Sequence, residues 1–329
     1  MKKIRENTIR VIEKCKEKNI KVAAVTKVFA GDFKIIENII NCGIDILADS
    51  RLLNLKRFNT FSVEKMLIRI PMKSEIENVV KYTDISLVSE LETIKEINEY
   101  ANNYNKVYDI ILMIDIGDLR EGVYFENYDE LYFYVKEILK MKNINLRGLG
   151  TNFSCFGGVI PTEDKFNTLI NIKYKLEKDF NIEIKEISGG SSGTLSLFEK
   201  INIPKEINQL RCGASIALGI GLNDTPFDYL HQDTCEFVTE FVEIKNKTFK
   251  GVTKKIGICV INIPELKKEY LVPLDKKIKI IDINDDYIVL DITNSENRLN
   301  LNDSVKFNLS YGGLLFMMNS PYIKKHYIE

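Results

Sequence analysis

The first two-thirds of the chain alternates between short apolar runs and longer polar stretches whose apolar positions recur at helical spacing. Eight apolar or β-branched runs have the length of buried strands: residues 22–26, 44–48, 66–70, 85–88, 107–116, 146–151, 182–188 and 207–211. Between most of them lie amphipathic segments rich in Lys and Glu, such as residues 91–100, 128–141 and 164–179. Eight strands separated by helices predict an α/β fold with a parallel (β/α)8, TIM-like barrel. A doubly wound open sheet is the alternative, but its Gly-rich dinucleotide fingerprint does not follow the first strand.

The pattern changes after about residue 225. Five further strand candidates follow with short polar turns and little helical signal between them, at residues 237–244, 255–263, 277–283, 287–292 and 304–309. This texture predicts a smaller, mainly antiparallel β domain and is compatible with a barrel. Residues 223–227, which contain Asp-Thr-Pro, are suited to a linker. We therefore expect a barrel over residues 1–225 and a β domain over residues 226–329.

Composition narrows the class of protein. A chain of 329 residues that is 45% hydrophobic can bury large cores. The 46 basic and 47 acidic residues leave a net charge of -1, which gives no attraction to nucleic acid or to an anionic membrane. No stretch approaches the roughly 20 apolar residues of a membrane span, and the N-terminus lacks an apolar signal core. The six scattered cysteines form no CxxC pair, which indicates reduced thiols in a cytoplasmic protein, and two histidines argue against a histidine metal site or triad.

Lys27 is the first candidate for chemistry. It follows the apolar run 22–26 and precedes the turn signal Gly31-Asp32, so it sits where a barrel strand reaches the end that carries active sites. A partly desolvated lysine at that position can act as a Schiff-base nucleophile. The alternative is a lysine whose stem lies along the barrel while its ammonium reaches water.

A second signal follows the seventh and eighth strands. The sequence Ser-Gly-Gly-Ser-Ser-Gly at residues 188–193 offers hydroxyls, small residues and backbone N–H groups, which suit a phosphate; a flexible loop or a simple helix cap is the alternative. A barrel commonly binds phosphate at these two loops, and Arg211 ends the eighth strand. A lysine, a phosphate site and an arginine around one barrel mouth indicate pyridoxal phosphate.

Several segments together resemble one family. They are residues 25–28 (Val-Thr-Lys-Val), 48–51 (Ala-Asp-Ser-Arg), 115–122 (Asp-Ile-Gly-Asp-Leu-Arg-Glu-Gly), 150–158 (Gly-Thr-Asn-Phe-Ser-Cys-Phe-Gly-Gly), 188–192, 208–213 and 311–315. With them the chain resembles the alanine/ornithine racemase group of pyridoxal-phosphate enzymes, and within it the ornithine racemases.

The resemblance implies a role for each matching position. Lys27 forms the Schiff base with the cofactor and acts as one catalytic base, and Arg120 approaches the phenolic oxygen. Asn152 replaces a histidine that lies beside the cofactor ring in alanine racemases. The phosphate is held by Ser191, Ser192, Gly213 and Ala214. Arg211 donates to the pyridine nitrogen; a guanidinium cannot protonate the ring, so the cofactor is a weaker electron sink and transamination is restrained.

The base for the second face of the substrate does not carry over. The tyrosine that follows the lysine in alanine racemases is absent, since Val28 follows here, and residues 284–287 (Asn-Asp-Asp-Tyr) replace a Ser-Ser-Asp-His segment usual in ornithine racemases. Tyr287 and Tyr311 are the candidates, and the alternative is that both are ordinary amphipathic tyrosines of the β domain. Cys155 is a base on position alone, although a buried cysteine is more often a packing residue.

Carboxylates beside these groups suggest the substrate. Asp118 and Glu121 flank Arg120, so they either bind a substrate ammonium or orient the arginine. The segment Asp49-Ser50-Arg51 at the second strand end is either a structural ion pair or a loop that shapes the site.

The resemblance therefore implies an amino-acid racemase that interconverts L- and D-ornithine, or another basic amino acid, by removing and returning the Cα proton. The expected partners are a small amino-acid substrate and a second copy of the chain in a homodimer, with no nucleic acid and no membrane. The alternatives are a pyridoxal-phosphate homeostasis protein and a racemase paralogue that has lost turnover.

Overall fold

The computed structural model describes residues 1–154 and 158–329, which form two compact units. The barrel unit contains Lys2–Lys27 and Gly31–Gln232, and the β unit contains Met1, Val28–Ala30 and Asp233–Glu329.

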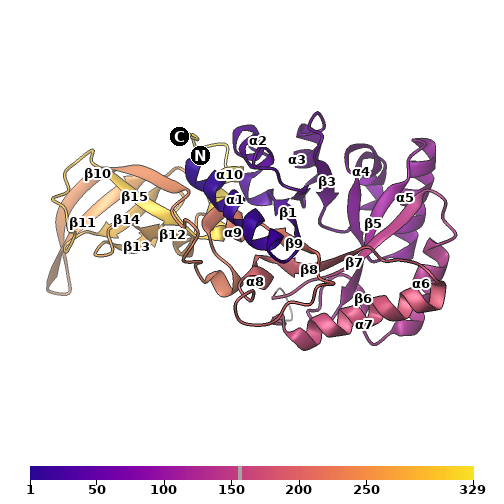
Figure 1. Ribbon diagram of the computed structural model, residues 1–329. Helices are drawn as coiled ribbons and strands as arrows, with labels where there is room; N and C mark the ends of the chain where they lie inside the picture. Colours follow the sequence, from indigo (N-terminus) through magenta and orange to yellow (C-terminus); the bar gives the residue numbers. More distant parts are fainter. Residues whose placement is uncertain (155–157) are drawn as a thin grey trace. The chain divides into compact units, whose positions relative to one another are not determined.

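Within the described residues, eight parallel strands of the barrel unit close into a ring (Figure 1), which confirms the predicted TIM-like barrel. They are β1 (Lys21–Val25), β2 (Ile46–Asp49), β3 (Glu64–Leu67), β4 (Ile85–Val88), β5 (Tyr108–Asp115), β7 (Ile144–Thr151), β8 (Glu186–Ser191) and β9 (Gln209–Cys212). The pairing of β9 with β1 and of β4 with β5 completes the circle, while the short β6 (Val123–Tyr124) adds to β5 outside it. All eight strands contain residues of the eight apolar runs.

Helices cover the outside of this ring (Figure 1). They are α1 (Lys2–Lys16), α2 (Phe33–Ile40), α3 (Leu52–Arg57), α4 (Ile76–Tyr82), α5 (Leu91–Asn103), α6 (Tyr128–Ile138), α7 (Glu163–Phe180), α8 (Ser192–Leu195) and α9 (Ala214–Leu218). Helix α1, which the sequence reading did not single out, is tied to the end of the unit by Asn7: its side chain donates to the carbonyls of Ile216 and His231 and accepts from the His231 N–H.

Small and apolar side chains fill the inside of the ring. One buried cluster takes alternate residues of β1, β2, β4 and β5 together with Met66 of β3: Ala23, Val25, Ile46, Ala48, Met66, Ile85, Leu87, Ile111 and Met113. Gly150 makes room for this cluster, because a Cβ there would lie 2.9 Å from the Met113 sulfur. The centre of the barrel is therefore packed, and chemistry is confined to its ends.

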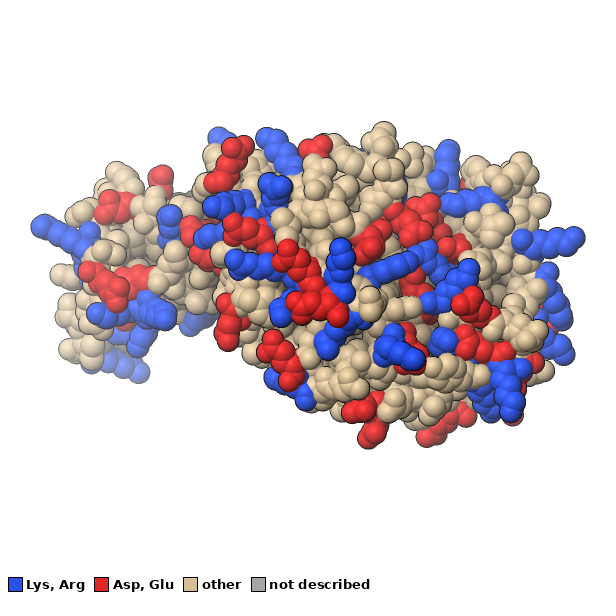
Figure 2. Space-filling view, in the orientation of Figure 1, with Lys and Arg blue, Asp and Glu red and all other residues tan. Residues whose placement is uncertain are grey.

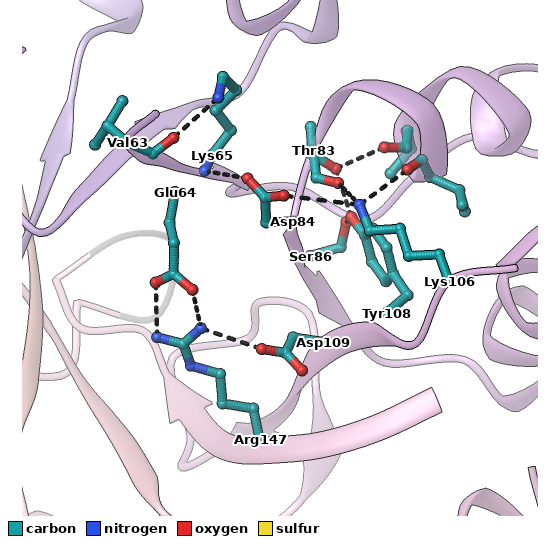
Figure 3. A network of polar contacts seen from close by, with 12 residues as sticks. Val63, Glu64, Lys65, Thr83, Asp84, Ser86, Lys106, Tyr108, Asp109 and Arg147 are labelled. Carbon is teal, nitrogen blue, oxygen red and sulfur yellow. Dashed lines mark hydrogen bonds and ion pairs between the residues drawn. The ribbon is translucent and has the colours of Figure 1, made fainter. Parts of the chain in front are cut away.

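The N-terminal ends of the strands carry a charged network around Arg147 (Figure 3). Its guanidinium donates to both oxygens of Glu64 at 2.8 and 3.0 Å, to Asp109 at 3.1 Å and to Glu186 at 2.9 Å. These partners are the first or second residues of β3, β5 and β8, so one side chain of β7 binds the starts of three other strands. A cavity of about 280 Å³ lies beside it, lined by Lys21, Asn145, Lys185 and Asn208 in addition to members of the network.

The β unit contains a six-stranded antiparallel sheet in the order β12-β15-β10-β11-β14-β13. The strands are β10 (Glu236–Phe249), β11 (Val252–Val260), β12 (Leu271–Pro273), β13 (Lys279–Ile283), β14 (Tyr287–Asp291) and β15 (Ser304–Leu309), and helix α10 (Tyr311–Asn319) follows. Its separate core includes Phe241, Cys259, Leu290, Phe307 and Met317. The predicted antiparallel domain is confirmed, and a register shift between Phe241 and Glu243 in β10 is where the long strand changes partners.

One shifted strand and two additional elements distinguish the structure from the sequence prediction. The seventh strand, expected at residues 182–188, occupies Glu186–Ser191, because the chain continues as a strand through Gly189 and Gly190. A Cβ on Gly189 would lie 2.4 Å from Ile207, so glycine permits this close approach. Helix α10 and strand β12 were not expected; β12 is only three residues long and contains Pro273.

Candidate active site

Lys27 lies immediately beyond the C-terminal end of β1 and is partly exposed. The residue before it, Thr26, is buried, and its N–H donates to the Ala48 carbonyl at 2.9 Å, which extends the pairing between β1 and β2. The Lys27 carbonyl accepts from Arg51 Nη1 at 3.2 Å. The predicted lysine is thus at a strand end with its backbone fixed on both sides, as a covalent attachment point requires.

Arg211, on β9, is buried and makes contacts across the same end of the ring. Its Nη1 donates to Ser188 Oγ at 2.5 Å, and its Nη2 donates to the Thr151 carbonyl at 2.6 Å and to Asn152 Oδ1 at 2.9 Å. These partners lie on β8, the neighbour of β9 in the ring, and at the end of β7, the next strand after β8. The structure therefore joins two residues predicted from separate motifs, Arg211 and Asn152.

This contact fixes the orientation of the Asn152 amide. A guanidinium only donates, so the atom facing Arg211 is the amide oxygen and Nδ2 points elsewhere. Nδ2 is buried and has no hydrogen-bond partner among the described residues. A buried donor without an acceptor costs roughly 1–3 kcal/mol, and an oxygen of a bound ligand would remove that cost. The residues therefore fit an oxygen-bearing cofactor such as pyridoxal phosphate.

The predicted phosphate residues form a compact group at the ends of β8 and β9. Ser192 is buried, and its Oγ accepts from the N–H groups of Gly213 at 3.2 Å and Ser215 at 3.1 Å. Ser191 is exposed and caps the first turn of α8, accepting from the Gly193 N–H at 3.4 Å. Gly213 lies against β1, since a Cβ there would be 3.0 Å from the Val25 side chain; Ala214 follows it as the first residue of α9.

The loop after β5 holds the next group. Arg120 and Glu121 form a two-pronged ion pair, with Nε to Oε2 and Nη2 to Oε1 both at 2.8 Å. Asp118 is buried, and its Oδ1 accepts from the Val159 N–H at 3.0 Å. Glu121 is thus placed as an orienting partner of Arg120, and Asp118 links this loop to the segment after β7. Their role as a substrate pocket stays a prediction.

The candidates for the second acid–base group belong to the β unit. Tyr287 begins β14 with 43% of its surface exposed, and Tyr311 is the first residue of α10 and partly exposed. Gly312 and Gly313 let this helix pack on Tyr270, because a Cβ on Gly313 would lie 2.4 Å from the Tyr270 carbonyl oxygen. Cys155 lies outside the described residues. The assignment of a second base therefore stays a prediction.

Two contacts of this region are not evident from the sequence. Ser188 lies in the Ser-Gly-Gly-Ser-Ser-Gly segment without a predicted role of its own, and its hydroxyl accepts from Arg211. Asp49 and Arg51 do not form the ion pair considered above: the Asp49 carboxylate accepts the Arg51 backbone N–H, and the guanidinium turns to Lys27. Only the three-dimensional pairing of β1 with β2 makes this arrangement evident.

Comparison with known proteins now adds to this geometry. Residues 1–219 match the family model described as alanine racemase, N-terminal domain. An ornithine racemase of Acetoanaerobium sticklandii is 35% identical over 98% of this chain and 96% of its own length. A lysine racemase of Thermotoga maritima is 36% identical over 99% of this chain and 96% of its own length.

Solved structures share the fold. An alanine racemase from Bartonella henselae, crystallised with covalently bound pyridoxal phosphate, superposes with a TM-score of 0.75 at 14% identity, covering 99% of this chain and 97% of that one. At this identity the likeness concerns the fold.

Proposed function

This chain belongs to the alanine racemase family, and we propose that it is a pyridoxal-phosphate-dependent racemase of a basic amino acid, ornithine or lysine. The observation that carries the proposal is its near-full-length similarity to an ornithine racemase and a lysine racemase. Both named substrates have a side-chain ammonium. The homeostasis-protein alternative finds no support in relatives that are racemases over both units.

The cofactor supplies an electron sink that makes the substrate Cα proton acidic enough to remove. The chain would hold it covalently through Lys27 and hold its phosphate through Ser191, Ser192 and the Gly213-Ala214 backbone. Asn152 Nδ2 would donate to one of its oxygens, and Arg120 would lie at its phenolic oxygen. The buried Ser188, Thr151 and Arg211 exclude water from this part of the strand ends.

Arg211 keeps the pyridine nitrogen unprotonated in this proposal. It is locked by Ser188, Thr151 and Asn152, so it is held as a fixed donor. Because a guanidinium stays protonated at any working pH, it cannot pass a proton to the ring. Electron withdrawal is therefore moderate, which favours return of a proton to Cα over side reactions.

Racemisation needs a proton removed from one face of Cα and returned to the other. Lys27 is proposed for one face, and Tyr287 or Tyr311 for the other. We propose a homodimer in the cytoplasm, because a tyrosine from the β unit of a partner copy would complete the site. Asp118 and Glu121 are proposed to lie near the substrate ammonium, with Glu121 shared between that ammonium and Arg120.

The test is Cα deuterium incorporation in D₂O, followed by proton NMR, with L-ornithine, L-lysine and L-alanine as substrates. We expect loss of the Cα proton signal for the two basic amino acids and appearance of the D-enantiomers, with far slower exchange of alanine. Lys27→Ala should abolish exchange and the visible absorption of the bound cofactor. Lys21→Ala, at the opposite end of the same strand, is the matched control and should retain both.

Three outcomes would refute separate parts of the proposal. Exchange of alanine at the rate of ornithine would refute the basic-substrate assignment. A wild-type protein that binds the cofactor through Lys27 but exchanges none of the three would refute racemase activity on these substrates. Retention of the cofactor band by Lys27→Ala would refute the attachment site.

A further inference from the structure

Asp49, the last residue of β2, is a buried carboxylate without a cationic hydrogen-bond partner. Its relative exposure is 0%. Its Oδ1 accepts from the Arg51 backbone N–H at 2.8 Å, and its Oδ2 accepts from Thr26 Oγ1 and Asn54 Nδ2, both at 3.1 Å. Every partner donates, so the set matches an ionised carboxylate, although burial raises the pKa of Asp49 above its ordinary value. A buried charge held only by neutral donors is costly, and a neutral residue of similar size would avoid that cost.

The contacts of Asp49 lead to one place, the backbone that carries Lys27. The Thr26 hydroxyl is shared between Asp49 and the Ala48 carbonyl, which fixes the residue before Lys27. The Arg51 backbone is held by Asp49, and the Arg51 guanidinium donates to the Lys27 carbonyl. Asp49 therefore acts on the Lys27 backbone at two points. It binds Thr26, the residue before the lysine, and it holds Arg51, whose side chain binds the Lys27 carbonyl.

The turn after Lys27 is fixed by the same group. Asn54, on α3, is buried and holds Asp49 with its amide nitrogen, while its Oδ1 lies against Gly31. A Cβ on Gly31 would be 2.7 Å from that oxygen, and Gly31 has a φ of +73°, which favours glycine. The polar group Thr26–Asp49–Asn54 thus lies between β2, α3 and the strand that presents the lysine.

We propose that Asp49 is a positioning residue for Lys27, acting through Thr26 and Arg51. The proposal rests on the proposed function, since it gives the lysine its cofactor and its substrate proton. The lysine ammonium lies about 6 Å from its own Cα along a flexible stem, so a backbone rotation of about 10° displaces it by about 1 Å. A misplacement of that size can cost roughly 100-fold in rate.

The experiment compares Thr26→Val with Thr26→Ser. Valine keeps the shape of threonine but removes the donor, whereas serine keeps the donor and removes a methyl group. A packing role predicts that valine performs at least as well as serine; a positioning role predicts the opposite order. Arg51→Ala, at an exposed side chain, and Asp49→Asn complete the set.

Two readouts separate this inference from the proposed function. The first is the rate at which the cofactor-free chain takes up pyridoxal phosphate and fixes it to Lys27, trapped by borohydride and located by peptide mass spectrometry. The second is kcat and KM for Cα exchange with ornithine and lysine. Thermal unfolding of each cofactor-free variant reports stability alone.

We expect Thr26→Val, Asp49→Asn and Arg51→Ala to slow attachment and lower kcat, by roughly 10- to 100-fold for the first two. KM should change by less than about threefold, and Thr26→Ser should stay within about threefold of the unmodified protein in both rates.

If the unmodified protein attaches the cofactor but exchanges no amino acid, the attachment rates of the variants still test the inference. The inference is overturned if valine equals serine at position 26, if the variants lose only thermal stability, or if Lys27 takes up no cofactor. Should Asp49→Asn not fold, the Thr26 pair and Arg51→Ala carry the decision.

Discussion

Replacing Arg147 by methionine should destabilise the barrel unit, and more at about pH 8 than at about pH 5. The guanidinium links β7 to β3, β5 and β8, but its partners differ in burial: the side chains of Glu64 and Asp109 are 44% and 27% exposed, and that of Glu186 only 5%. An exposed pair contributes about 0–1 kcal/mol, so the loss is dominated by Glu186. Removing one partner of a buried pair costs about 3–5 kcal/mol, which is the loss expected for Arg147→Met at about pH 8.

The sign of the pH dependence follows from the two glutamates. Burial raises the pKa of Glu186 above its ordinary value of 4.5, even with Arg147 in place, and hydrogen bonding to Arg147 lowers the pKa of Glu64. Without the arginine, the pKa of Glu186 rises further and that of Glu64 returns toward 4.5. A carboxyl whose pKa is raised by folding binds its proton more tightly in the folded state, so the fold loses stability as the pH rises through that pKa. The deficit of Arg147→Met should therefore be smaller at about pH 5 than at about pH 8.

The assay is urea unfolding followed by far-UV circular dichroism, since the chain has no Trp. Arg147→Met/Glu186→Gln is the decisive control: it removes the stranded charge and should regain at least half of the loss. Exchange activity should be unchanged in both variants under folding conditions, because the network lies at the end of the strands opposite Lys27. Equal deficits at both pH values, or no recovery in the double variant, would refute the assignment of the cost to Glu186.

Three further predictions concern single contacts. Arg211→Glu should slow racemisation and increase conversion of the cofactor to its amine form, measured by chromatography of the released cofactor; an unchanged partition would contradict the role of Arg211. Gly190→Ala should weaken cofactor binding in equilibrium titrations, because Gly190 has a φ of +98° and a Cβ there would lie 2.7 Å from Thr194 Oγ1, whereas Gly193→Ala, with its nearest neighbour at 3.5 Å, should bind normally. Tyr108→Phe should lower the free energy of unfolding by about 1–3 kcal/mol in urea titrations, since the buried phenol bonds Thr83 at 2.5 Å and Ser86 at 2.6 Å, and an unchanged midpoint would show that those hydroxyls find other partners.

The fold was predictable from sequence because burial on both faces leaves a strong mark on parallel strands. The run at residues 85–88 is strand β4 itself, and residues 304–309 are β15. The prediction failed where a strand contains residues that are typical of loops. Gly189 and Gly190 indicate a loop by composition, yet they continue β8, because their missing side chains let Ile207 and Phe153 approach.

The sequence pointed to candidate site residues only where a reactive or small polar residue coincides with a strand end. Lys27, Arg211 and Ser192 meet both conditions, and their roles stay predictions. The link between Thr26 and Asp49 does not meet these conditions, since the two residues are 23 positions apart and meet only through the parallel register that sets Val25 beside Ala48. An Asp two positions before an Arg indicates an ion pair, and the sequence contains nothing to show that the arginine turns to another backbone.

Two buried carboxylates of the barrel unit, Glu186 and Asp49, have different roles. Glu186 starts its strand and is paired with a guanidinium, and that arrangement links strands and resists unfolding. Asp49 ends its strand and is held by neutral donors, so its charge is not offset by a cation in hydrogen-bond contact. If stability alone governed both positions, Asp49 would be the easier one to replace by a neutral residue, because no cation would be stranded by the change. The two sites therefore give opposite expectations. Glu186→Gln removes the most buried of the three carboxylates that bind Arg147 and should chiefly affect unfolding. Asp49→Asn should chiefly affect the rates that depend on Lys27.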